Sequence, residues 1–283
     1  MIDLHCHTNV SDNSLSIPEV IQEARAKGIT HLAITDHDTT LGLQQAMEIG
    51  SRAGVEIIPG IEISAFDYER KVRAHILGYF VQPGHPALKE LCEPLAAARH
   101  AVSRRMVNIL HDHGYLISWE QVSQLAGLTG VFKQHIMHAL MKAGYCDGIY
   151  GSLYEKLFAG GGSCKKQGLA HIPLTYADAV AAIKAIRAAG GVPVLAHPGL
   201  CNNFTAIPGW VEAGLAGIEA VHPKHDETAT QLAWLLARNF NLVVTGGSDY
   251  HGFYGDTGCG LGIESLTVES IRLLQQRKET ISL

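Results

Sequence analysis

The sequence lacks several features that mark whole classes of protein. None of its 6 cysteines stands in C-x-x-C spacing, so a structural zinc knot is not expected. No run of about 18 apolar residues occurs, so we expect no membrane span and no membrane partner. The first residues show no basic segment followed by an apolar one, so we expect no signal peptide. Together these absences predict a cytoplasmic protein with reduced thiols.

An excess of basic residues is also missing. The chain has 22 Lys and Arg against 27 Asp and Glu, a formal net charge of -5, whereas a general nucleic-acid-binding protein would be basic. We therefore expect no stable nucleic-acid partner, although a local basic pocket is compatible with this balance. Hydrophobic residues make up 47% of the 283 residues, enough for a full core. Histidine is abundant, with 16 residues, and it is the commonest metal ligand.

Short apolar runs alternate with helical segments in the first part of the chain. The expected strands there are residues 2–7, 31–36, 55–64 and 73–79, and the expected helices are 17–27 and 43–53. The pattern resumes near residue 175, with expected strands at 192–197, 217–222 and 242–245. This alternation predicts a mostly parallel sheet with helices outside it. Seven strands with right-handed crossovers predict a closed or nearly closed α/β barrel.

Only helical patterns occur between these two stretches. Leu88 to His113 has apolar residues at roughly helical spacing, and shorter helices are expected at 119–125, 131–143 and from 154 onward. We interpret residues 86–168 as an inserted helical subdomain. The barrel would then consist of residues 1–85 and 169–283.

Histidine and carboxylate residues stand at the ends of six of the seven expected strands. In parallel barrels the active site lies at the carboxyl ends of the strands. Residues i and i+2 of a strand share a face, so His5 and His7 should point the same way, as should Asp249 and His251. The nine candidate metal ligands are His5, His7, Asp12, His37, Glu62, His75, His197, Asp249 and His251. Nine such groups gathered at one mouth without a metal would leave polar atoms unpaired and like charges together.

This ligand set predicts two or three divalent metal ions. Mixed histidine and carboxylate ligands suit Zn, Mn or Fe better than Ca or Mg alone. Nine ligands exceed the need of one ion, and phosphatases and nucleases hold ions about 3.5–4 Å apart. Ions in that arrangement lower the pKa of a bridging water and hold phosphoryl oxygens during in-line attack.

Several motifs, in order along the chain, resemble those of the polymerase-and-histidinol-phosphatase (PHP) family of metal-dependent phosphoesterases. They are His5-x-His7, Asp12, Thr35-Asp36-His37-Asp38, Gly60-Ile61-Glu62, His75-Ile76-Leu77-Gly78, Ala196-His197-Pro198-Gly199 and Gly247-Ser248-Asp249-x-His251. The resemblance implies a distorted (β/α)7 barrel with a trinuclear site. It implies three ligand groups: His5, His7, Glu62 and Asp249; then Glu62, His75 and His197, with Glu62 bridging; then Asp12, His37 and His251.

The helical stretch resembles the insert of a PHP subgroup that includes 3',5'-nucleotide bisphosphate phosphatases and 5'-to-3' exoribonucleases. Members commonly show Arg-Pro-His-Ile-Ala, where this chain has Lys133-Gln134-His135-Ile136-Met137. Lys133 in place of Arg loses bidentate phosphate binding. The resemblance implies hydrolysis of a phosphomonoester by a metal-activated hydroxide. The expected substrate is a small phosphorylated compound, a nucleotide such as a 3',5'-bisphosphate or a short oligonucleotide.

Catalytic and substrate-binding roles are hypotheses at this point. Glu62 would bridge ions, Asp249 would orient the attacking water, and His225 or His222 would protonate the leaving oxygen. Four residues are expected to contact substrate, three of them from the insert and one at the mouth: Arg104, Lys133, His135 and His222.

Other functions fit parts of the pattern. An amidohydrolase acting on C–N bonds also uses H-x-H after the first strand, but it usually has a bridging Lys after the fourth, where this chain has His75. A 5'-3' exoribonuclease would use the same chemistry on short RNA and would need a basic track for the strand. Histidinol phosphate is a further candidate substrate, made less favourable by the insert. A non-catalytic metal-binding scaffold is disfavoured because all nine ligand positions are filled.

Overall fold

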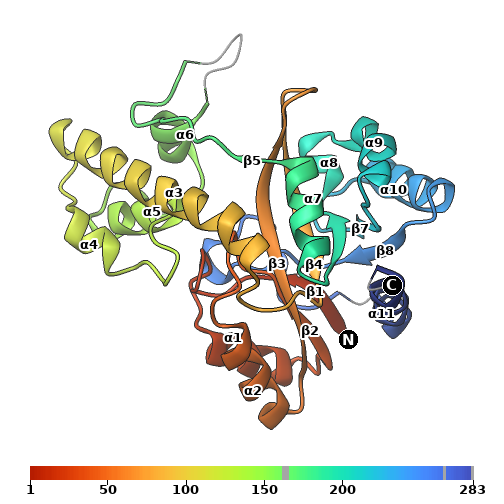
Figure 1. Cartoon of the computed structure of the whole chain (residues 1–283). Helices are drawn as coiled ribbons and strands as arrows, with labels where there is room; N and C mark the ends of the chain where they lie inside the picture. The colour runs from red at the N-terminus through yellow and green to blue at the C-terminus, as the bar shows by residue number, and fades with distance from the viewer. Residues whose placement is uncertain (161–165, 264–265, 282–283) are drawn as a thin grey trace.

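Seven strands curl into a nearly closed barrel with helices around it (Figure 1). The computed structural model of the chain describes residues 1–160, 166–263 and 266–281. The barrel strands follow in spatial order as β1 (Ile2–Cys6), β2 (His31–Ile34), β3 (Glu56–Asp67), β4 (Val72–Tyr79), β6 (Val192–Leu195), β7 (Gly217–Val221) and β8 (Val243–Gly246). A two-residue strand, β5 (Ala177–Asp178), pairs with β3 outside this path. The α/β barrel expected from the sequence is confirmed.

The barrel closes through the residues that follow β8. Tyr250 forms a parallel bridge with Cys6, and the amide of His7 donates to the carbonyl of Tyr250 over 3.1 Å. Gly247 allows this approach, because a Cβ there would lie 2.4 Å from the backbone nitrogen of His5. The two ends of the chain that carry histidine and aspartate motifs therefore lie side by side.

β4 departs from the parallel arrangement expected for most of the sheet, since it runs antiparallel to both β3 and β6. Residues 68–71 join β3 to β4 directly, which leaves no length for a crossover helix. His75 was expected at the carboxyl end of its strand. It instead lies near the start of β4, opposite Ser64, because the reversed strand begins at the mouth of the barrel.

Helices cover the outer face of the sheet. They are α1 (Ile17–Ala26), α2 (Leu43–Ala53), α7 (Ala179–Ala188), α8 (Pro198–Cys201), α9 (Ile207–Glu212), α10 (Glu227–Asn239) and α11 (Val268–Ile281), with the 3-10 turns η1 (Phe204–Ala206) and η2 (Gly252–Tyr254). The N-cap residue before α1 is Ser16, which forms a capping box with Glu19. α2 ends at Gly54, whose φ of 74° suits a glycine. One buried cluster, including Leu4, Ala33 and Leu77, fills the barrel, and a second packs the helices onto it.

The helical segment consists of α3 (Pro86–Asp112), α4 (Trp119–Ser123), α5 (Lys133–Lys142) and α6 (Ser152–Phe158). It extends to one side of the barrel in Figure 1 and has a buried cluster of its own, which includes Leu110, Ile136 and Phe158. The start of α3 belongs to the barrel instead, since Leu88 and Cys92 are part of the cluster beneath the barrel helices. The division of the chain at residues 86 and 168 remains a prediction, and residues 161–165 lie outside the described ranges.

The state of the cysteines and the character of the helices bear on two expectations drawn from the sequence. All five cysteines in the described ranges are free; Cys164 lies outside them. Among the described helices, none combines the length and the apolar character that crossing a membrane requires.

Candidate metal centre

The nine candidate ligands come together at one mouth of the barrel, around the carboxylate of Glu62. Its Oε1 atom lies 2.9 Å from Nδ1 of His75 and 3.0 Å from Nε2 of His197. Its Oε2 atom lies 3.4 Å from Nε2 of His5, 3.3 Å from Nε2 of His7 and 3.1 Å from Nδ1 of His37. Five imidazoles thus surround one carboxylate that is 1% exposed. This places Glu62 where a bridging ligand would stand.

Three overlapping groups of side chains offer ligand atoms within 4.8 Å of one another. They are His5, His7, Glu62 and Asp249; His7, Asp12, His37 and His251; and His37, Glu62 and His75. The first matches a group implied by the family resemblance, and the second contains all of another. His197 joins the third group through its contact with Glu62. Which residue binds which ion remains a prediction.

The donor atoms fit divalent cations. Among the candidate ligands, five buried imidazole nitrogens form no hydrogen bond with any described residue; they are Nε2 of His5, both nitrogens of His7, Nδ1 of His37 and Nδ1 of His197. Buried polar atoms nearly always have hydrogen-bond partners, so five unpartnered nitrogens in one cluster favour a site for bound cations. Imidazole nitrogens and carboxylate oxygens together are a ligand set for Zn, Mn or Fe.

The carboxylates of the centre are held in the ionised form. Burial would raise the pKa of Glu62 and Asp249, but the neighbouring imidazoles outweigh it and hold both pKa values well below the ordinary range. Burial lowers the pKa of His7, but the carboxylates of Asp249 and Glu62 outweigh it and raise the pKa to about 10. A cation that binds here would displace such a proton, because a metal ligand must be deprotonated.

Glu219 is a further candidate site residue, which the sequence reasoning missed. Its Oε1 atom lies 3.0 Å from Nδ1 of His5, and its Oε2 atom accepts a hydrogen bond from the amide of His197 over 2.8 Å. Such a carboxylate orients a ligating imidazole and fixes its tautomer. The available signal was a single charged residue inside the apolar run of β7. With Glu219, every barrel strand contributes to the centre.

Two candidate ligands have unusual backbone conformations. His197 has a φ of 23° and Asp249 a φ of 51°, a region that residues other than glycine rarely occupy. Strain of this kind persists only where the surrounding structure holds it in place, and it gathers at functional sites. His197 lies two residues after the end of β6 and Asp249 three residues after the end of β8, where the turns direct their side chains to the mouth.

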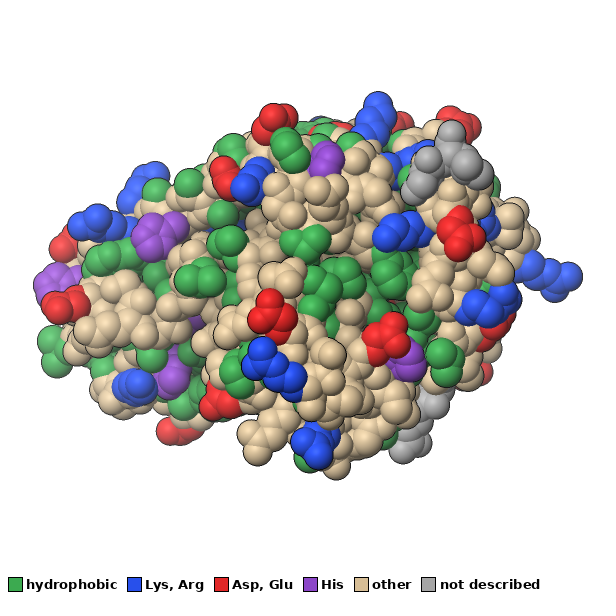
Figure 2. Space-filling model, turned by 60° about the horizontal axis from the view of Figure 1, so that its bottom comes forward, with side chains coloured by type: hydrophobic (Ala, Val, Ile, Leu, Met, Phe, Trp, Pro, Cys, Tyr) green, Lys and Arg blue, Asp and Glu red, His purple; other side chains and the backbone are tan. Residues whose placement is uncertain are grey.

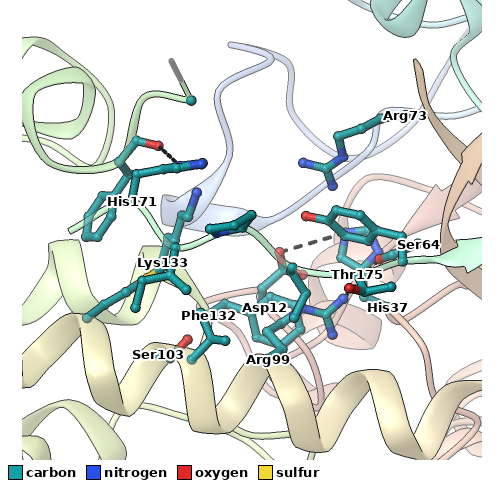
Figure 3. A pocket seen from close by; sticks show the side chains of 18 of the residues that line it. Asp12, His37, Ser64, Arg73, Arg99, Ser103, Phe132, Lys133, His171 and Thr175 are labelled. Carbon is teal, nitrogen blue, oxygen red and sulfur yellow. Dashed lines mark hydrogen bonds and ion pairs between the residues drawn. The ribbon is translucent and has the colours of Figure 1, made fainter. Parts of the chain in front are cut away.

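A cavity of about 670 Å³ opens beside the metal centre. Asp12, His37 and His75 line it from the barrel, and Lys133 lines it from α5. In Figure 3, Lys133 and Arg73 reach into the cavity from different sides, with Arg99 on α3 below them. The cavity therefore joins the candidate ligands to a set of cationic side chains.

Arg99 is the most firmly held of these cations. Its Nη2 atom donates to Asp38 and, over 3.1 Å, to the hydroxyl of Ser64, and the guanidinium lies over the ring of Phe132. Its Nη1 atom is buried and has no hydrogen-bond partner among the described residues. An arginine fixed on one side with a free donor on the other is suited to binding an anion.

Arg73 and Lys133 complete the cationic wall. Arg73 stacks on the ring of Tyr176 at 4.4 Å. Burial, and then the charge of Arg73, lower the pKa of Lys133 to about 8. Lys133 was selected from the sequence, whereas Arg73 was missed. The signal for Arg73 was its place two residues before His75 in one strand, which puts both side chains on one face.

Three of the four residues expected to bind substrate do not line this cavity: Arg104, His135 and His222. Arg104 is exposed and lies 5.7 Å from the ring of Trp119, because its position on α3 faces away from Arg99. His135 is 1% exposed, and its Nδ1 atom accepts a hydrogen bond from the amide of Phe132, which caps the start of α5. The sequence-based choices of Arg104 and His135 are not supported by the geometry.

The two histidines considered as general acids differ in their surroundings. Nδ1 of His225 lies 3.1 Å from the carbonyl oxygen of Ala220, and Nε2 accepts from the amide of Gly199, so neither nitrogen is free to give a proton to substrate. The general-acid role of His225 is therefore not supported. His222 lies at the centre, but both of its nitrogens are engaged as well: its Nδ1 accepts from the amide of Lys224, and its Nε2 is 3.4 Å from Oδ2 of Asp249. The geometry therefore supports neither histidine as general acid.

Comparison with known proteins gives consistent matches over nearly the whole chain. A family model described as PHP domain matches residues 3–187. A phosphoribosyl 1,2-cyclic phosphate 1,2-diphosphodiesterase from Eggerthella lenta is 41% identical over 254 residues, covering 89% of this chain and 95% of that protein. A 5'-3' exoribonuclease from Haemophilus influenzae is 30% identical, covering 88% and 89%, and a 3',5'-nucleoside bisphosphate phosphatase from Chromobacterium violaceum is 28% identical, covering 88% and 87%.

A solved structure from Bifidobacterium adolescentis, described as that of a candidate metal-dependent phosphoesterase, superimposes with a TM-score of 0.86. Its sequence is 29% identical, and the match covers 98% of this chain and 96% of that one. The barrel and the helical segment are thus matched together.

Proposed function

Because the chain belongs to the PHP domain family and is a metal-dependent phosphoric ester hydrolase, we propose that it hydrolyses a phosphate ester on a ribose that carries a second phosphate group. The observation that carries this proposal is the cavity with candidate metal ligands on one side and cations on the other. The metal centre would take the scissile phosphate. Arg99, Arg73 and Lys133 would take the second.

The size and lining of the cavity support a small substrate. A volume of about 670 Å³ lies in the usual range for small-molecule sites. Phe66, Tyr154 and Tyr176 add aromatic surface on which a sugar or a base can pack. A nucleoside 3',5'-bisphosphate carries two phosphate groups on one ribose and meets both requirements.

Phosphoribosyl 1,2-cyclic phosphate is a second candidate substrate. The relative from Eggerthella lenta, named for that compound, shares 41% of aligned residues with this chain, compared with 28% for the bisphosphate phosphatase. This compound also carries phosphate at two places on one ribose. One phosphate would therefore bind at the metal centre and the other at the cationic wall. The metal centre would then also have to accept a cyclic phosphodiester as the phosphate that is attacked.

A long RNA strand fits less well. On the face shown in Figure 2, Lys and Arg side chains are scattered among acidic ones and form no continuous basic track. The overall charge of -5 gives no general attraction to a polyanion either. Short oligonucleotides remain candidates because only their terminal ribose needs to enter the cavity.

Divalent ions bound at the centre would act as Lewis acids. They would polarise phosphoryl oxygens and lower the pKa of water, so that hydroxide is available for attack near neutral pH. The chain's own residues would do the rest. Asp249 would orient the attacking water, with Nε2 of His222 holding its Oδ2 atom. Arg99 would neutralise and fix the second phosphate, which places the scissile bond in line for attack. Zn, Mn and Fe are the ions that this ligand set favours.

Hydrolysis of a defined set of compounds, followed by identification of the products of each, tests the proposed function. The protein, purified without chelators and supplied with Mn²⁺, would be assayed on a nucleoside 3',5'-bisphosphate, phosphoribosyl 1,2-cyclic phosphate, a short oligoribonucleotide, histidinol phosphate and a cyclic amide. We expect one of the first two to give the highest kcat/KM. Turnover of the amide alone, or of no phosphate ester, would overturn the proposal.

Lys133 should give the reaction a pH dependence. With a pKa of about 8, its ammonium is charged below pH 8 and loses its charge as the pH rises above it. The KM for a substrate with two phosphate groups should therefore increase above pH 8, by up to about tenfold per pH unit. Lys133→Arg should flatten this rise, because guanidinium stays protonated. Lys142→Arg, on the exposed face of the same helix, is the control; matching profiles for all three proteins would exclude this role.

A further inference from the structure

Helix α5 reaches the metal centre through one side chain. Nε2 of Gln134 donates a hydrogen bond to Oδ2 of Asp12 over 3.0 Å, across a sequence separation of 122 residues. Asp12 belongs to the group that also contains His7, His37 and His251. The candidate ligands all come from the barrel, so Gln134 links the helical segment to one of them directly.

The contact leaves the metal-facing side of Asp12 available. Oδ1 lies 3.4 Å from Nε2 of His251 and accepts from the hydroxyl of Ser11. Oδ2, the oxygen bound by Gln134, lies 3.9 Å from Nε2 of His37. Gln134 stands at the start of α5 and lines the cavity next to Asp12. Its hydrogen bond therefore restrains the rotation of the Asp12 carboxylate.

The same helix contacts the loop that carries His251. The hydroxyl of Tyr254, three residues after His251, is 2.8 Å from Nδ1 of His138 on α5. On the other side, the amide of Thr129, just before α5, donates to the carbonyl of Val10, two residues before Asp12. α5 and the residues just before it thus contact two of the loops that supply this ligand group, those of Asp12 and His251.

We propose that Gln134 is a positioning residue that sets the affinity of the ion bound by Asp12, His37 and His251. The inference rests on the proposed function in requiring divalent ions at the centre. In the described residues, the hydrogen bonds and ion pairs of Glu62 and Asp249 involve barrel residues alone, so the other ions should not depend on Gln134. Outer partners of metal ligands typically change metal affinity by about 10–100-fold.

The test is a metal titration of Gln134→Met, which keeps the side-chain length and removes the donor. We expect elemental analysis after dialysis to show one ion fewer per chain than in the wild type. Mn²⁺ titration should show that one binding step is weakened by roughly tenfold or more while the others are unchanged. Phosphate release at limiting Mn²⁺ should fall, and excess Mn²⁺ should restore it. Gln44→Met, an exposed glutamine on α2, is the control.

The outcomes separate this inference from the proposed function. If the wild type binds divalent ions and releases phosphate but Gln134→Met has the same metal content and titration, the inference alone is wrong. If Gln134→Met loses activity and melting temperature without recovery in excess Mn²⁺, Gln134 supports the fold and does not set ion affinity. If the wild type binds no divalent ion, both proposals fail.

Discussion

Glu62→Gln is expected to lower phosphate release on the order of 10³-fold, with fewer ions bound per chain. Five imidazole nitrogens lie within 3.4 Å of the Glu62 carboxylate. Among the candidate ligands, this carboxylate is thus the one in contact with the largest number of histidines. Glutamine keeps the shape but is neutral, and its amide nitrogen faces histidines as a donor. Loss of a single preorganised donor already costs roughly 10²–10³ in kcat in well-studied enzymes.

Elemental analysis and phosphate release would be measured together on Glu62→Gln and on Glu56→Gln. Glu56 lies six positions earlier in β3 and is exposed, so its variant controls for a general effect on the strand. Glu56→Gln should behave as the wild type. Full metal content and full rate in Glu62→Gln would contradict the bridging role.

Asp249→Ala and His251→Ala should remove different ions, although the two residues lie two positions apart. Oδ1 of Asp249 lies 3.3 Å from Nε2 of both His5 and His7, whereas Nε2 of His251 lies 3.4 Å from Oδ1 of Asp12. Nδ1 of His251 does lie 3.5 Å from Oδ1 of Asp249, but the two residues fall in different groups of candidate ligands. Each variant should therefore lose about one ion per chain and most of its activity, roughly 10²-fold or more.

Anomalous diffraction from Mn²⁺-soaked crystals would locate the ion lost in each variant. The peak near His5 and Glu62 should weaken in Asp249→Ala, and the peak near Asp12 and His37 should weaken in His251→Ala. His31→Ala, a histidine at the start of β2 away from the mouth, should keep every peak. Loss of the same peak in both variants would show that the two residues serve one ion.

The parts of the fold that follow from local patterns were predictable. Apolar runs bounded by turn residues identified all seven barrel strands, and Gly54 marked the end of α2. The direction of β4 was not predictable in the same way, because a strand has the same apolar pattern whichever way it runs. Its one signal was the four-residue link at 68–71, which is too short for a crossover.

The candidate site likewise contains residues that local sequence patterns identified and residues that they did not. Ligands that stand in short motifs at strand ends were found, because i and i+2 spacing fixes their side. Glu219 and Arg99 were not selected, since each acts through a partner distant in sequence: Glu219 through His5, and Arg99 through Asp38. His225 and Arg104 were selected for their residue type, but orientation decides their role, and periodicity alone did not supply it.

Helix α3 belongs to both buried clusters, with Leu88 in the barrel cluster and Leu110 in that of the helical segment. At about 1.5 Å per residue, its 27 residues span roughly 40 Å, and Arg99 stands near the middle. The helix is therefore held at both ends, with Arg99 at its middle. Because Arg99 is also bonded to Asp38 and Ser64 of the barrel, repacking of the far end would leave its distance from the metal centre unchanged. The helical segment can thus diverge in sequence while this cation stays in place beside the barrel.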